Sequence, residues 1–213
     1  MSDIKNNSFA RWLSRNPIWG FVVIVFVFFS FAADHFFALQ NVENILVQAS
    51  TIGLIALGLT LVMINGNIDL SVGAILALAA TVTVDMQGWE TLAFLGDWVL
   101  LVAVLAGLLC GTLLGGLNGL IVWKTGVDSF IVTLGAMLGI RGLVFVYTRE
   151  QSFYASSFAY SDFGSSSIGP LPTLAVLFIA CAIVIHVLLS RTVHGRNTYA
   201  VGGNREAAVN AGI

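Results

Sequence analysis

Long, uninterrupted runs of apolar residues dominate this sequence, and they decide in which solvent the chain can fold. The run at residues 45–64, ILVQASTIGLIALGLTLVMI, is one example. At about 1.5 Å per residue, a helix of this length covers roughly 30 Å, the thickness of a bilayer's hydrocarbon core. Charged residues make up only 9% of the chain, against roughly 25% in an ordinary soluble domain. So little polar surface excludes a soluble globule and predicts a membrane protein.

Apolar segments divide the chain into about six transmembrane helices, which predicts an all-α membrane protein. They lie near residues 18–33, 45–64, 70–86, 98–123, 129–147 and 171–189. Residues 65–69 interrupt the second and third segments, so we expect these two helices to form a hairpin. A cleaved signal peptide is the weaker interpretation of the first segment, because further spans follow it. We therefore expect a tail at 1–17, a transmembrane domain at 18–190 and a polar segment at 191–213.

The lysines and arginines predict the orientation of these helices, because cytoplasmic loops hold an excess of positive charge. With the N-terminus inside, most basic residues fall in cytoplasmic segments: Lys5, Arg11, Arg15, Lys124, Arg191, Arg196 and Arg205. Arg149 falls outside, and Arg141 lies within a span. We therefore expect both termini in the cytoplasm and residues 149–170 outside, as a long connection without an apolar period of its own.

A regular glycine spacing marks the fourth segment. Gly107, Gly111, Gly115 and Gly119 recur every four residues, which places them on one stripe of a helix. In membranes such a stripe usually allows close helix packing. The alternative is that the stripe lines a solute pathway, where the polar Asn118 would be useful.

Sequence signatures of covalent chemistry and of nucleotide binding are missing. The chain has no phosphate-binding GxxxxGK[ST] loop, nucleophile elbow, metal-ligand cluster or paired-carboxylate site. Cys110 and Cys181 lie in apolar runs, and the net charge of -2 offers no basic face to nucleic acid. The spans also lack a central Asp or Glu for a proton relay. We expect a protein that is not an enzyme, binds no cofactor or metal, and obtains energy from a partner.

The polar segment at the end of the chain predicts a short helix. Asn204 is a good N-cap, Glu206 suits the positive end of the helix dipole, and Gly212 can adopt a left-handed conformation that ends the helix. A helix of about two turns is marginal in water by itself. We therefore expect it to dock against a partner on the cytoplasmic face.

Two motifs resemble those of one transporter family. Asn204-Arg205-Glu206-Ala207-Ala208, followed by Ala211-Gly212-Ile213, resembles the coupling motif of ribose-type sugar ABC importer permeases. Gly66-Asn67-Ile68-Asp69-Leu70-Ser71-Val72-Gly73 resembles the family's GGIDLSVG hairpin, with Asn67 where the family usually has glycine. The motifs occur in the family's order, and the resemblance extends from about residue 45 onwards. For residues 65–71 an ordinary capped turn remains the alternative interpretation.

The resemblance implies a permease subunit of an ATP-driven importer that moves a small sugar, a pentose or hexose, across the bacterial inner membrane. Its partners would be two cytoplasmic ATPase subunits that bind the ATP, a second permease chain and an external sugar-binding protein. The coupling role would fall on Asn204, Arg205, Glu206, Ala207, Ala208, Ala211 and Gly212, and the hairpin motif on Gly66, Asn67, Asp69, Ser71 and Gly73. Because such permeases continue with further spans, the resemblance also implies a C-terminally truncated bundle. The rival functions are an ATPase-independent channel or scaffold and a membrane enzyme.

The predicted topology can be tested by labelling single cysteines with a membrane-impermeant reagent, after Cys110 and Cys181 have been replaced. Ser157→Cys should react from outside intact cells, whereas Thr192→Cys should react only after permeabilisation. The reverse pattern would contradict the orientation derived from the basic residues.

Overall fold

The computed structural model describes residues 16–213, apart from residues 97 and 156. The expected N-terminal tail, with Lys5, Arg11 and Arg15, lies outside the described residues. Two compact units make up the chain, with the boundary between Gln48 and Ala49 inside one long helix.

Every apolar segment expected to span the membrane is helical, and the predicted all-α class is confirmed. The helices are α2 (Pro17–Ala32), α3 (Leu39–Ile64), α4 (Val72–Met86), α5 (Trp98–Thr125), α6 (Ser129–Thr148) and α8 (Thr173–Arg191). By length and composition, α3, α5, α6 and α8 can cross a bilayer, whereas α2 and α4 are shorter, at 16 and 15 residues. Helix α3 begins before the predicted residue 45, because polar residues such as Gln40 and Asn41 continue the helix that the apolar run defines.

The first unit contains α2 and the first turns of α3. Pro17 opens α2 at a position where its missing N–H costs nothing. After α2 the chain turns through His35, whose φ is +63°. The rings of Phe36 and Phe37 then pack edge-on against Phe26, with centroids 5.3 and 6.1 Å away. These contacts hold the turn against the end of α2.

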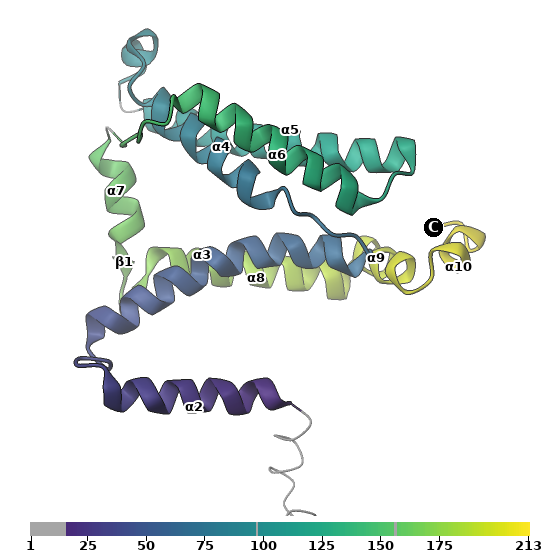
Figure 1. The fold of residues 1–213 in the computed structure, drawn as a ribbon, viewed down its shortest axis with the longest axis horizontal. Coiled ribbons are helices and arrows are strands. Elements are labelled where there is room, and N and C mark those ends of the chain that lie inside the picture. The colour runs from purple at the N-terminus through teal and green to yellow at the C-terminus, as the bar shows by residue number, and fades with distance from the viewer. Residues whose placement is uncertain (1–15, 97, 156) are drawn as a thin grey trace, which may run out of the picture. The chain divides into compact units, whose positions relative to one another are not determined.

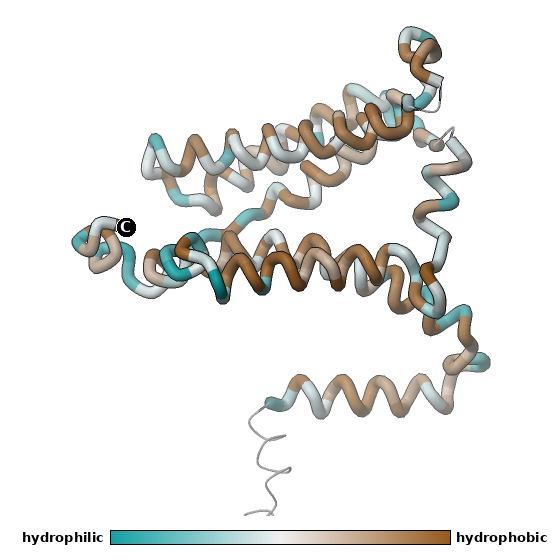
Figure 2. Tube along the Cα trace, turned by 180° about the vertical axis from the view of Figure 1, so that it is seen from behind, coloured by the Kyte–Doolittle hydropathy of each residue, from teal (hydrophilic) through white to brown (hydrophobic). Residues whose placement is uncertain are grey.

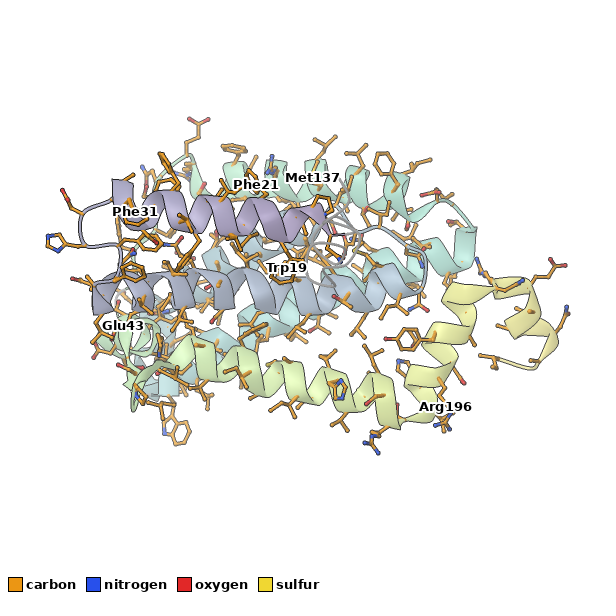
Figure 3. The ribbon with its side chains drawn as sticks, turned by 90° about the horizontal axis from the view of Figure 1, so that it is seen from below. Trp19, Phe21, Phe31, Glu43, Met137 and Arg196 are labelled. Carbon is orange, nitrogen blue, oxygen red and sulfur yellow. The ribbon has the colours of Figure 1, made fainter. Side chains whose placement is uncertain are left out.

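The helices of the second unit bury small side chains and expose large apolar ones. Its buried apolar residues are Ala74, Ala103, Ile140, Ala175 and Ala208, whereas Leu108, Val146 and Ile183 are 64%, 78% and 58% exposed. Figure 2 shows the apolar colouring running along the helices, with polar residues gathered at their ends and in the loops. Side chains also stand outward from the helices throughout Figure 3. This distribution suits helices that pack through small residues and face lipid with large ones.

The expected hairpin between α3 and α4 is not formed. Helix α4 instead packs against α5 and α6 (Figure 1). The connection from Asn65 to Ser71 is largely extended rather than a tight turn. The N–H groups of Ile68 and Leu70 bond to side chains of α6, and this carries α4 away from α3. The prediction was wrong because neighbouring apolar runs in a sequence need not pack together.

The connections that follow α4 and α6 contain short elements of secondary structure. A 3-10 helix, η2 (Glu90–Leu95), follows α4. After α6 come the helix α7 (Phe158–Ser165) and two antiparallel strands, β1 (Ser167–Ile168) and β2 (Leu171–Pro172). Residues 149–170, which have no apolar period of their own, therefore still form short elements, because short polar helices leave little apolar periodicity in the sequence.

A carboxylate joins α4 to α6 at this end of the helices. Asp85 accepts a hydrogen bond from the indole Nε1 of Trp89, at 2.9 Å, and another from the phenol of Tyr147 on α6. Tyr147 in turn stacks on Phe153, with ring centroids 6.3 Å apart. These aromatic residues therefore position the connections that leave the two helices.

The glycine stripe of α5 is in contact with α4 over only part of its length. A Cβ atom at Gly107 would lie 2.0 Å from Thr83 Oγ1 and 2.9 Å from the carbonyl oxygen of Ala79, both on α4. At Gly111 the nearest α4 atom would be 3.7 Å away, an ordinary contact. At Gly115 and Gly119 a Cβ would meet no atom within 4 Å among the described residues. Among the described residues, Gly107 and Gly111 thus contact α4, and a packing role for Gly115 and Gly119 stays a prediction.

Substitution along the stripe should therefore be graded by position. Gly107→Ala forces a methyl group against backbone of α4, and such overpacking typically costs about 1–3 kcal/mol of stability. Gly115→Ala places the same methyl group in open space and should be neutral, or stabilising through its higher helix propensity. Thermal unfolding of the purified protein in detergent measures both variants. Equal melting temperatures for the two would contradict the assigned contact.

Candidate functional site

The polar segment at residues 191–213 forms two helices, α9 (Val193–Gly203) and α10 (Arg205–Asn210). Helix α9 was not predicted. The residue that could have indicated its start is Thr192, whose side chain caps the helix by accepting a hydrogen bond from the N–H of Gly195 at 3.1 Å. Because Thr192→Cys would remove this cap, the exposed His194 is the better labelling position on the same helix.

Helix α10 begins and ends at the residues that the sequence indicated. The side chain of Asn204 accepts a hydrogen bond from the N–H of Ala207, at 2.9 Å. Gly212 has a φ of +79°, and the N–H groups of Gly212 and Ile213 bond to the carbonyls of Val209 and Ala208, both at 3.0 Å. This pairing is a Schellman motif, which satisfies the last carbonyls of a helix. The predicted cap and stop are confirmed.

One side of α10 packs against the rest of the protein, and its other sides are exposed. Ala208 is buried, at 4% exposure, whereas Val209 is 64% exposed and Arg205, Glu206 and Ala207 are also exposed. In Figure 1, α10 lies beyond α9, next to the end of the chain. The helix thus presents an apolar side chain flanked by charged ones.

The connection between α3 and α4 contains the second motif. Gly66 has a φ of +77°, a conformation that favours glycine. The non-glycine residues with positive φ in the described part of the chain do not include Asn67. Asparagine at this departure from the family's pattern therefore introduces no backbone strain. Gly73 lies in the first turn of α4, where a Cβ would meet open space.

A buried chain of hydrogen bonds anchors the end of this connection to α5. Asp69 Oδ1 accepts from the N–H of Ser71, at 2.8 Å, and from its hydroxyl, at 2.6 Å. The same hydroxyl accepts from Asn118 Nδ2 on α5, at 2.8 Å. Ser71 is fully buried and Asn118 is 8% exposed. A capped turn accounts for the Asp69 bonds but not for the bond to Asn118.

Two hydroxyls of α6 hold the middle of the connection. The N–H of Ile68 donates to Ser129 Oγ at 3.1 Å, and the N–H of Leu70 donates to Thr133 Oγ1 at 3.2 Å. Thr133 is buried, and its hydroxyl lies 2.7 Å from the carbonyl oxygen of Ser129, to which it donates. Ser129 and Thr133 were not among the predicted site residues, because a lone hydroxyl in an apolar run gives no sign of what it contacts.

A cavity of about 770 Å³ brings the two motifs together. Its wall is formed by the connection, by the last turns of α5, by the start of α6 and by the segment of α9 and α10. The residues that contribute polar groups or open backbone include Asn65, Gly66, Asn67, Asp69, Gly115, Asn118, Gly119, Ser129, Thr133 and Arg205. Asp69 and Arg205, which are far apart in the sequence, thus line the same space. So do Gly115 and Gly119 of the glycine stripe, where a Cβ would meet no atom within 4 Å among the described residues.

The described residues contain no group of three or more His, Cys, Asp or Glu side chains that could hold a metal ion. The polar groups around the cavity are amides, hydroxyls, the carboxylates of Asp69 and Asp128 and the guanidinium of Arg205, which can bind hydrogen-bonding groups of a solute.

Removing the Asn118 amide should destabilise the protein. Asn118→Leu keeps a similar volume but leaves the buried Ser71 hydroxyl without its donor, which should cost about 1–3 kcal/mol. Thr112→Val on the same helix is the control, because that hydroxyl bonds only to the Leu108 carbonyl one turn away. Chemical or thermal unfolding in detergent would compare them. An Asn118→Leu protein as stable as the control would show that the bond to Ser71 is unimportant.

Comparison with known proteins agrees with these motifs. Residues 41–213 match the family described as "Branched-chain amino acid transport system / permease component". The chain is 35% identical over 202 residues to the D-allose transport system permease protein AlsC of Escherichia coli, covering 95% of this chain and 60% of that protein. It is also 35% identical to the ribose import permease protein RbsC of Bacillus subtilis, covering 92% of this chain and 59% of that protein.

A third relative is the L-arabinose ABC transporter permease protein AraH of Azospirillum brasilense, which is 31% identical over 94% of this chain and 57% of its own length. This chain therefore spans about 60% of the length of the curated relatives that it matches. No solved structure matches it. The matched residues include the α3–α4 connection, the glycine stripe and the α9–α10 segment, and the chain belongs to this family of transport permeases.

Proposed function

We propose that this chain is a permease subunit of an ATP-driven importer, through which a small sugar crosses the plasma membrane. The observation that carries the proposal is α10, a helix capped at both ends, held through Ala208 and exposed elsewhere. A helix of 6 residues has no intrinsic stability in water. A partner that covers the exposed side would explain why its ends are so well defined.

The partner that α10 fits is a cytoplasmic ATPase subunit. The apolar Val209 supplies an anchor, and the charged Arg205 and Glu206 supply a rim. Residues 204–208 and 211–212 would form the docking surface, and ATP would bind to the partner. The importer would also contain a second permease chain and an external sugar-binding protein. Both termini would lie in the cytoplasm, with residues 149–170 on the outside.

The names of the relatives support a sugar as the transported solute. One relative is named for D-allose, one for ribose and one for L-arabinose. We infer the class, a pentose or hexose, from what these names share. The amides, hydroxyls and charges around the cavity are groups that hydrogen-bond sugar hydroxyls. We propose that this cavity belongs to the cytoplasmic end of the solute pathway.

Charge reversal in the first turn of α10 tests the docking role. Glu206→Lys places a positive charge at the positive end of the helix dipole and reverses the charge offered to the ATPase. Uptake and co-purification of the ATPase should both fall, while the amount of permease in the membrane is unchanged. Glu206→Gln, which only removes the charge, should have a smaller effect.

Glu150→Lys is the matched control, because it makes the same charge change at an exposed residue just after α6. It should leave co-purification of the ATPase intact. Normal ATPase association and normal sugar-stimulated ATP hydrolysis by Glu206→Lys would contradict the docking role. Uptake that needs no ATPase would instead favour a channel, and turnover of the solute would favour a membrane enzyme.

A further inference from the structure

One glycine of α9 lies directly against the backbone at the end of α3. A Cβ atom at Gly202 would lie 1.7 Å from the carbonyl oxygen of Ile64 and 2.8 Å from its carbonyl carbon. Since real Cβ atoms do not approach other atoms so closely, backbone meets backbone here with no side chain between them. At the next residue, Gly203, a Cβ would meet no atom within 4 Å. The close contact with the end of α3 is therefore made at Gly202 and not at Gly203.

Ile64 is the last residue of α3, immediately before the connection that lines the cavity. Helix α3 ends in a Schellman motif, in which the N–H of Gly66 bonds to the Met63 carbonyl at 2.9 Å and that of Asn67 to the Val62 carbonyl at 3.2 Å. These bonds make the start of the connection move with the end of α3. A displacement of the Ile64 carbonyl should therefore also displace Gly66 and Asn67.

On its other side, Gly202 is joined almost rigidly to α10. Helix α9 ends at Gly203 and α10 begins at Arg205, so Asn204 alone separates them. The N–H of Asn204 bonds back to the Ala200 carbonyl at 3.1 Å, while its side chain caps α10. Asn204 thus bonds to both helices, which limits the movement of α10 relative to Gly202.

We propose that Gly202 is the positioning residue through which movement of α10 is transmitted to the connection between α3 and α4, and so to the cavity. The proposal rests on the proposed function, in which an ATPase moves α10. Coupling between separated sites travels through contiguous packed contacts, and a contact without an intervening side chain has little room to absorb displacement. Ser129, Thr133 and Asn118 hold the far part of the connection to α5 and α6. Displacement at Ile64 would therefore alter the connection itself.

Two neighbouring substitutions test this role in the complete importer, reconstituted in vesicles with its ATPase. Gly202→Ala inserts a methyl group between α9 and the Ile64 carbonyl, and Gly203→Ala inserts the same group into open space. For Gly202→Ala we expect normal association with the ATPase and continued ATP hydrolysis. The solute moved per ATP should fall by roughly twofold to thirtyfold, the range that single residues on such a path typically produce. Gly203→Ala should resemble the wild type in all three measurements.

An independent measurement follows the connection itself. Ile68→Cys, at a position that is 52% exposed, is labelled in a background without Cys110 and Cys181, with the ATPase either nucleotide-free or trapped with vanadate. The labelling rate should differ between the two states when residue 202 is glycine, and Gly202→Ala should reduce that difference.

Normal solute movement per ATP in Gly202→Ala would overturn this inference and leave the proposed function standing. If Gly202→Ala does not assemble, the inference is tested by the labelling rates of the Ile68→Cys variant that retains Gly202. Equal rates in the two states would overturn the inference, and different rates would support it. A wild-type chain that binds no ATPase would overturn the proposed function as well.

Discussion

The connection between α3 and α4 depends on hydrogen bonds from side chains that lie far away in the sequence. An extended segment among helices has no neighbouring strand to bond with, and unpaired backbone groups are costly away from water. Ser129 and Thr133 accept the N–H groups of Ile68 and Leu70, and Asp69 accepts that of Ser71. Removing these partners would leave the segment without a defined path, and α4 without a defined starting point on α5 and α6.

Close packing of α4 and α5 begins where this hydrogen-bonded region ends. Near the connection, Gly115 and Gly119 face a cavity rather than a helix, whereas further along α5 the bare backbone at Gly107 is pressed against α4. The two helices therefore diverge toward the connection and converge away from it. The glycine stripe is one feature in the sequence, yet it serves contact at one end and open space at the other.

The cavity gives a physical reason for two motifs to occur in one chain. The connection that carries Asp69 and the helix that begins at Arg205 line the same space, and Gly202 on the preceding helix α9 lies against the backbone at the end of α3. In the proposed function the energy comes from a partner ATPase, and this arrangement places the proposed docking helix α10 next to the segment that borders the solute's proposed route. The family to which the chain belongs is one of transport permeases, which agrees with such a division of labour.

Local features were predictable from the sequence because their causes are local. Apolar runs long enough for a bilayer defined the helices, and Asn204 and Gly212 defined the ends of α10, since caps act within a turn of the residue concerned. The short helices α7 and α9 escaped prediction, because neither has an apolar run to mark it.

Tertiary structure alone decided which helices pack together and what each polar residue contacts. The six apolar segments have similar, mostly apolar sequences. The sequence therefore does not indicate that α4 packs against α5 and α6 rather than against α3. The same holds for Asn118. Its sequence position is equally compatible with a solute pathway or a partner, and the structure shows that its amide donates a hydrogen bond to the Ser71 hydroxyl. Gly202 and Gly203 are identical neighbours in the sequence, and only the position of the Ile64 carbonyl distinguishes them. Contacts between segments depend on the direction in which each helix leaves its connection, and that direction is set by bonds between residues that are far apart along the chain.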